Sequence, residues 1–90
     1  MTNAVTEKDV ERQMKDVYIT TIQGFDKPVT YVEVRMTNGF TVRETTTCVD
    51  PLNYSEKVGA EICLKRIKDK IWFLLGYMLQ ENEYNTSYTK

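Results

Sequence analysis

The feature that most constrains this fold is the stretch 53–82, which reads NYSEKVGAEICLKRIKDKIWFLLGYMLQEN. It contains no proline, and Asn53 followed three residues later by Glu56 is the pattern of a helix cap. At ~100° per residue, its apolar side chains form one broad stripe. We therefore predict one long helix that covers a small sheet with the residues of this stripe, which are Ala60, Cys63, Leu64, Ile67, Ile71, Leu74, Leu75 and Met78.

The second half of the predicted helix is apolar around its whole circumference. From Ile71 to Leu79 the apolar run is interrupted only by Gly76 and contains no charged residue. A helix that is apolar on all sides is usually buried on all sides, and one small sheet cannot reach every side. Soluble monomers rarely expose apolar patches of this size. We therefore expect a homo-oligomer with an interface formed by Ile71, Trp72, Leu75, Tyr77, Met78 and Leu79.

Length and charge restrict the class of protein. Ninety residues make a single domain, with an expected ordered part at 6–82 and a mobile tail at 83–90. A net charge of −1 gives no general attraction to nucleic acid or to anionic membrane. The longest apolar run is about half of the ~20 residues that a bilayer crossing needs. We therefore expect neither duplex nucleic acid nor a membrane as partner.

The residue types also restrict the chemistry. The chain has no histidine, which excludes Ser-His and Cys-His nucleophile pairs and imidazole metal sites. Cys48 and Cys63 have no second pair at metal-binding spacing, and without a secretory signal they are expected to be reduced thiols of a cytoplasm. No pair of carboxylates has an unusual environment in the sequence. We predict a protein that is not an enzyme and needs no metal or cofactor.

The chain before residue 53 predicts one short helix and three strands. Thr6, with Asp9 three residues later, is expected to cap a helix over roughly 7–16. Alternating or β-branched segments at 17–23, 29–37 and 40–47 predict an antiparallel meander with one apolar face. Asn38-Gly39 between the last two strands favours a type I′ turn, in which both residues have positive φ. The fold class is α+β, in the order αβββα.

Several uncommon residues occur in the order and spacing of a known family. They are Asn38-Gly39-Phe40-Thr41-Val42, Cys48-Val49-Asp50-Pro51, Asn53-Tyr54, Gly59, Lys70-Ile71-Trp72, Gly76-Tyr77 and Leu79. From about residue 17 to residue 79 the chain resembles a family of small tailed-phage proteins, named after gene forty-nine of one phage and gene sixty-six of another. Family members often carry an acid where this chain has Leu75. The resemblance implies an accessory phage gene of unknown function that is expressed in the host bacterial cytoplasm, and it supplies no catalytic residue.

Two groups of residues are candidate ligand-binding positions. The outward face of the second and third predicted strands offers guanidinium and hydroxyl groups suited to phosphate: Arg35, Arg43, Thr45 and Thr47. The alternative is that both arginines pair with Glu33 across the strands. Trp72 and Tyr77 could stack on a nucleotide base, or they could belong to the core or to the subunit interface. The basic residues at 65–70 point to all sides of the helix at ~100° per residue and form no groove for a duplex.

The function that these features favour is binding without catalysis. We expect a phage accessory protein that counters a host activity by sequestering a small anionic ligand, such as a host immune signalling nucleotide, in a pocket of the oligomer. Two alternatives remain at this point, namely an inhibitor that binds a host protein directly and a regulatory or structural phage protein. A nucleotide-binding protein would be stabilised by its ligand through mass action, whereas a protein inhibitor would not respond to nucleotides.

Overall fold

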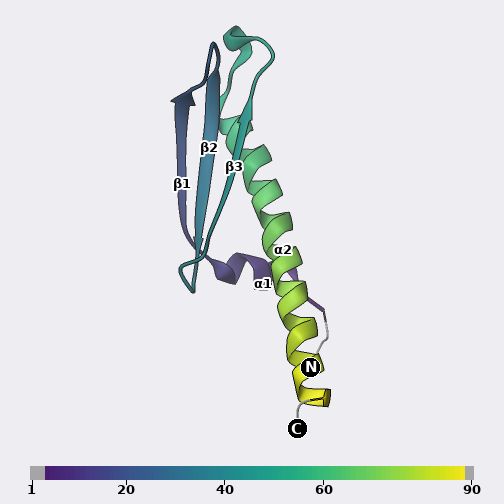
Figure 1. Ribbon diagram of the computed structural model, residues 1–90. Coiled ribbons are helices and arrows are strands. Elements are labelled where there is room, and N and C mark those ends of the chain that lie inside the picture. The colour runs from purple at the N-terminus through teal and green to yellow at the C-terminus, as the bar shows by residue number, and fades with distance from the viewer. Residues whose placement is uncertain (1–3, 89–90) are drawn as a thin grey trace.

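The computed structural model describes residues 4–88 of the chain (Figure 1). Two helices and one three-stranded antiparallel sheet follow in the order αβββα, which confirms the predicted α+β class. The elements are α1 (Glu7–Gln13), β1 (Met14–Gln23), β2 (Pro28–Met36), β3 (Thr41–Thr47), a single 3-10 turn η1 (Pro51–Asn53) and α2 (Glu56–Tyr88).

The sheet has the order β1-β2-β3, with one face against α2 and one face open. Val34 in the central strand pairs with Val17 on one side and with Val42 on the other. Because side chains alternate between the two faces of a strand, this register places the apolar residues of β2 and β3 on the inner face. The buried core contains Val10, Val32, Val34, Met36, Val42, Ala60, Cys63, Ile67 and Ile71.

α2 runs along the β3 side of the sheet (Figure 1), so it covers the three strands unequally. Val32, Val34 and Val42 are buried beneath it, whereas Val17 and Ile19 on the inner face of β1 remain about half exposed. The predicted apolar stripe of the helix is confirmed at its central positions, because Ile67 and Ile71 are completely buried.

The first helix is shorter than predicted. Thr6 and Asp9 form the predicted capping box, with the Thr6 side chain accepting from Asp9 N and the Asp9 side chain accepting from Thr6 N. The helix ends at Gln13, and Met14 already has extended backbone angles. Pairing of β1 with β2 reaches back to Met14 across a bulge between Met14 and Asp16. Strand pairing therefore replaces the last predicted turn of helix.

The long helix begins later and ends later than predicted. Asn53 lies in η1, and Ser55 caps α2 by accepting a hydrogen bond from Val58 N at 3.2 Å. At the other end the helix continues to Tyr88, past the predicted end at residue 82. Residues 83–88, predicted as a mobile tail, are helical, because this polar segment contains no glycine or proline to end the helix. Residues 89–90 of that predicted tail lie outside the described part of the chain.

Three residues, 37–39, form the turn between the hydrogen-bonded Met36 and Phe40, and the predicted type I′ turn is wrong. Gly39 has a φ of 91°, whereas no non-glycine residue in the described chain, Asn38 included, has a positive φ. Gly39 N donates to Met36 O at 2.9 Å, and Met36 N donates to Phe40 O at 2.7 Å. Asn38 Oδ1 accepts from Phe40 N at 3.0 Å. This pattern is that of a hairpin loop with one left-handed residue, which is the role of Gly39.

Candidate functional site

The two arginines of the outer sheet face are each paired with a carboxylate. Arg35 on β2 donates from Nε and Nη2 to Asp16 Oδ2 at 2.9 and 2.7 Å. Arg43 on β3 donates from Nε to Glu33 Oε2 at 3.1 Å. The alternative of pairing with Glu33 therefore holds for Arg43 but not for Arg35. These ion pairs are exposed and add little stability, but they offset the positive charge that a bound phosphate would need.

The two predicted threonines lie on the same outer face. Thr45 is opposite Tyr31 in the strand register, and Thr47 Oγ1 donates to the carbonyl oxygen of Pro28 at 2.7 Å. The sheet thus gathers Arg35, Arg43 and both threonines on one face. Ligand binding by this face stays a prediction.

The predicted aromatic residues lie elsewhere. Trp72 and Tyr77 belong to α2, which packs against the inner face of the sheet, and Trp72 is 42% and Tyr77 65% exposed. A single chain therefore does not bring them to Arg35 and Arg43. A nucleotide site built from all six predicted residues would need more than one subunit.

The predicted interface residues have different surroundings within the chain. Ile71 is completely buried in the core of its own chain, so intrachain packing already uses this side chain. Leu75 and Leu79 are about half buried and line a hollow together with Val5 and Met78. Trp72, Tyr77 and Met78 remain exposed.

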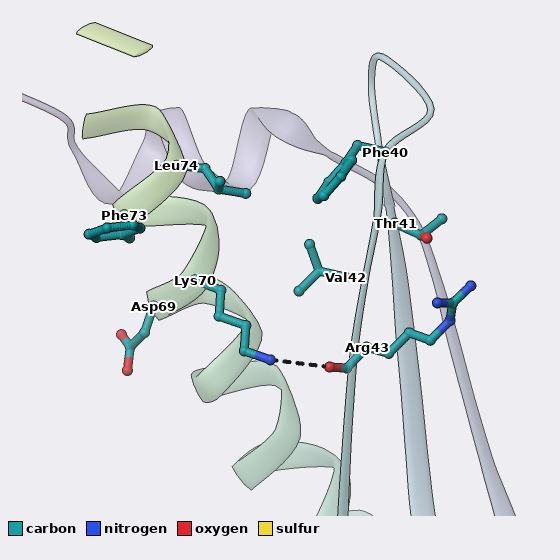
Figure 2. Close-up of a pocket in the computed structure, with 8 residues that line it drawn as sticks. All are labelled: Phe40, Thr41, Val42, Arg43, Asp69, Lys70, Phe73 and Leu74. Carbon is teal, nitrogen blue, oxygen red and sulfur yellow. Dashed lines mark hydrogen bonds between the residues drawn. The ribbon is translucent and has the colours of Figure 1, made fainter. Parts of the chain in front are cut away.

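An open apolar groove lies between the turn end of β3 and the middle of α2 (Figure 2). Its volume is about 560 Å³. Leu74 and Lys70 point from α2 toward the strand, and Phe40 and Val42 face them (Figure 2). The Phe40 and Phe73 side chains are both mostly exposed. This groove has no signature in the local sequence, because its walls come from two elements that are distant in the chain.

A cluster of charges joins β3 to α2 beside this groove. The Glu44 side chain is only 17% exposed and forms ion pairs with Lys70 and, at 3.9 Å, with Arg66. Lys70 Nζ also donates to the carbonyl oxygen of Arg43 at 3.4 Å. Burial raises the pKa of the adjacent Cys63 thiol, and the Glu44 carboxylate raises it further. These groups satisfy one another and present no reactive pair.

A second polar cluster holds the start of α2 against the sheet. Tyr54 Oη lies 2.8 Å from Thr21 Oγ1 and 2.6 Å from Thr30 Oγ1, and Thr21 also donates to Glu56. Thr30 is completely buried, and a Cβ placed on Gly59 would lie only 2.2 Å from Thr30 Oγ1. The glycine lets the helix approach the strand, so we assign this cluster a structural role.

The end of the sheet away from α1 exposes three large apolar side chains on two loops. Phe25 in the β1–β2 turn is fully exposed, and Val49 and Leu52 in the β3–α2 connection are each 92% exposed. Figure 1 shows both loops at this end of the molecule. We call these three residues the apolar tip. No periodic pattern in the sequence marks these three residues, because they lie on loops between the regular elements.

Hydrogen bonds order both loops of the apolar tip. Gly24 N donates to the carbonyl oxygen of Lys27 at 2.9 Å in the β1–β2 turn. Asp50 accepts from Leu52 N through its side chain at 3.0 Å and from Asn53 N through its carbonyl at 2.9 Å. The apolar side chains are therefore presented by defined backbone.

Residues 4–88 hold no group of three or more side chains suited to a metal ion. Neither helix in this part of the chain has the length and apolarity that a bilayer crossing requires.

A family model matches residues 5–82, which is most of the chain. The family is described as "Phage protein (N4 Gp49/phage Sf6 gene 66) family". The chain belongs to this family. The match confirms the resemblance found in the sequence and identifies a phage protein, and it says nothing of the activity. No curated protein and no solved structure matches the chain.

Proposed function

We propose that this chain is a non-enzymatic phage accessory protein that acts in the host cytoplasm and counters a host activity by binding a host protein. The family membership supports the phage context. The observation that carries the proposal is the apolar tip, because Phe25, Val49 and Leu52 are exposed on ordered loops. Figure 1 shows their two loops at the same end of the molecule, and exposed apolar surface of this kind marks protein interaction sites.

The partner should be a protein with an apolar pocket. Phe25 and Leu52 offer no charge and no hydrogen-bonding side-chain group, so their favourable interaction is the burial of apolar surface. Binding hot spots consist of such side chains inserted in pockets of the partner. Sequestration of an anionic nucleotide is less well supported, because Arg35 and Arg43 each already pair with a carboxylate.

The experiment is site-specific photo-crosslinking in host cells. A photoreactive residue at Leu52 should give one discrete adduct with a host protein, whereas the same residue at Tyr18, on the outer sheet face, should not. The purified partner should then bind the chain in titration calorimetry. Leu52→Ser should weaken that affinity by about tenfold or more, and Asn53→Ser, at the neighbouring exposed position, should leave it unchanged.

A nucleotide library in a thermal melt provides the opposing result. If one nucleotide raises the melting temperature through mass action, and Arg43→Ala abolishes that rise without unfolding the chain, the protein sequesters a nucleotide and the proposal is wrong. Equal crosslinking from Leu52 and Tyr18 would also exclude the apolar tip as the binding surface.

A further inference from the structure

Four residues share the side of α2 that faces away from the sheet. They are Lys65, Trp72, Gly76 and Glu83, and at ~100° per residue they fall within about 40° of one another. They lie opposite Ile67, which is completely buried against the sheet. We call these four residues the outer stripe of α2.

The middle of the outer stripe is uncharged and borders a hollow. The Trp72 side chain is 42% exposed, and Phe73 beside it is 77% exposed. Trp72 and Gly76 line a hollow of about 250 Å³, whose other walls are Val5, Leu79, Gln80 and Glu83. A Cβ placed on Gly76 would meet no atom within 4 Å, so space above this glycine is open. The stripe therefore carries the partly exposed indole of Trp72 one helical turn before Gly76, above which there is free space.

The ends of the outer stripe carry opposite charges. Lys65 stands seven residues before Trp72, and Glu83 stands seven residues after Gly76. Within residues 4–88, no ion pair involves either Lys65 or Glu83. Between them, residues 71–80 contain no charged side chain. The stripe is thus basic at one end, apolar in the middle and acidic at the other.

We propose that a second copy of this chain packs its α2 antiparallel against the outer stripe, about a two-fold axis. In this pairing Trp72 of each copy covers Gly76 of the other. Lys65 lies seven residues, or about 10 Å, before Trp72, and Glu83 lies the same distance after Gly76. The same register therefore places Lys65 opposite the partner's Glu83. Apolar contact and charge complementarity therefore select one register. A two-fold interface uses one patch twice, so it requires this self-complementarity.

The oligomeric state at micromolar concentration, measured by sedimentation equilibrium, tests the pairing. The native chain should be a dimer. Gly76→Leu should raise the dimer dissociation constant by about tenfold or more, because the leucine occupies the space that Trp72 of the other copy needs. The same substitution should raise the melting temperature of the monomer, since leucine favours a helix more than glycine. Val58→Leu, on the same side of α2 but outside the contact, should leave the dissociation constant unchanged.

A charge exchange tests the register. Lys65→Glu and Glu83→Lys should each weaken the dimer, because each places like charges opposite one another. The combination of both substitutions should restore it. A monomeric native chain, a dimer indifferent to Gly76→Leu, or a double variant no tighter than the single ones would each overturn the pairing. A native monomer that instead binds a host helix through Trp72 would assign the stripe to another partner. None of these results bears on the apolar tip.

Discussion

At the scale of single residues, Gly59 fixes how closely α2 approaches the sheet. A Cβ at this position would lie 2.2 Å from Thr30 Oγ1 and 2.8 Å from Thr30 Cβ. Gly59→Ala should therefore destabilise the protein by about 1–3 kcal/mol, because the helix must shift away from β2, although alanine favours helices. Urea denaturation provides the measurement. Val58→Ala, at the exposed neighbouring position, should change stability little, and equal stability of Gly59→Ala and the native chain would contradict the close contact.

Gly39 and Asn38 provide a second residue-scale test, since only Gly39 has a positive φ. Gly39→Val should cost on the order of 1–3 kcal/mol, because a β-branched residue is strained in the left-handed region. Asn38→Asp keeps the acceptor for Phe40 N and should cost far less. A loss in Gly39→Val no larger than that in Asn38→Asp, measured by thermal denaturation, would contradict the left-handed conformation of Gly39.

The Cys63 thiol should give stability a pH dependence. Its pKa in the folded chain is raised by burial and by Glu44, so the unfolded chain loses this proton at lower pH than the folded chain. This contribution to stability is therefore fully present below the ordinary thiol pKa and is lost as pH rises above it, toward the raised pKa of the folded chain. Cys63→Val should reduce this decrease in unfolding free energy, whereas Cys48→Val should retain it. A decrease of the same size in both variants would assign it to other groups.

At the scale of elements, Lys70 connects α2 to the free edge of β3. It pairs with the partly buried Glu44 and donates to the carbonyl oxygen of Arg43. Lys70→Met should destabilise the protein by on the order of 1 kcal/mol and speed hydrogen exchange in β3. Lys57→Met, on an exposed position of the same helix, serves as the control. Unchanged exchange in β3 would mean that apolar packing alone holds the strand.

The element order was predictable from the sequence because each element has a clear period. Val32, Val34 and Met36 alternate with polar residues, and the buried positions Ile67 and Ile71 recur at helical spacing. The element ends were less predictable. The polar segment 83–88 has no apolar pattern, yet no residue in it ends the helix.

The candidate surfaces were only partly predictable, because their surroundings depend on contacts between distant segments. The sequence placed Arg35 and Arg43 on one strand face. The partner of Arg35 is Asp16. The prediction of a helix over 7–16 had placed Asp16 outside the sheet, whereas in the structure β1 includes it, and after the bulge it lies opposite Arg35. The apolar tip combines Leu52 with Phe25 of the β1–β2 turn, which is distant in sequence, so no local pattern could reveal it.

At the scale of the whole molecule, the chain is elongated. Its radius of gyration is 16.7 Å, whereas a compact domain of this length would have about 12 Å. The difference arises because α2 extends well past the end of the sheet (Figure 1). The buried core ends at Ile71, so the last turns of α2 add length with little core.

Shortening the chain therefore separates folding from association. Removal of residues 81–90 should leave a folded protein with nearly the native melting temperature, because all buried core residues, together with Leu75 and Leu79, are retained. The same removal takes away Glu83, and the proposed pairing through Lys65 should weaken. A chain that ends after Asn85 keeps Glu83 and should remain a dimer. Thermal denaturation and sedimentation equilibrium measure the two effects, and a shortened chain that fails to fold would show that the end of α2 is needed for the fold itself.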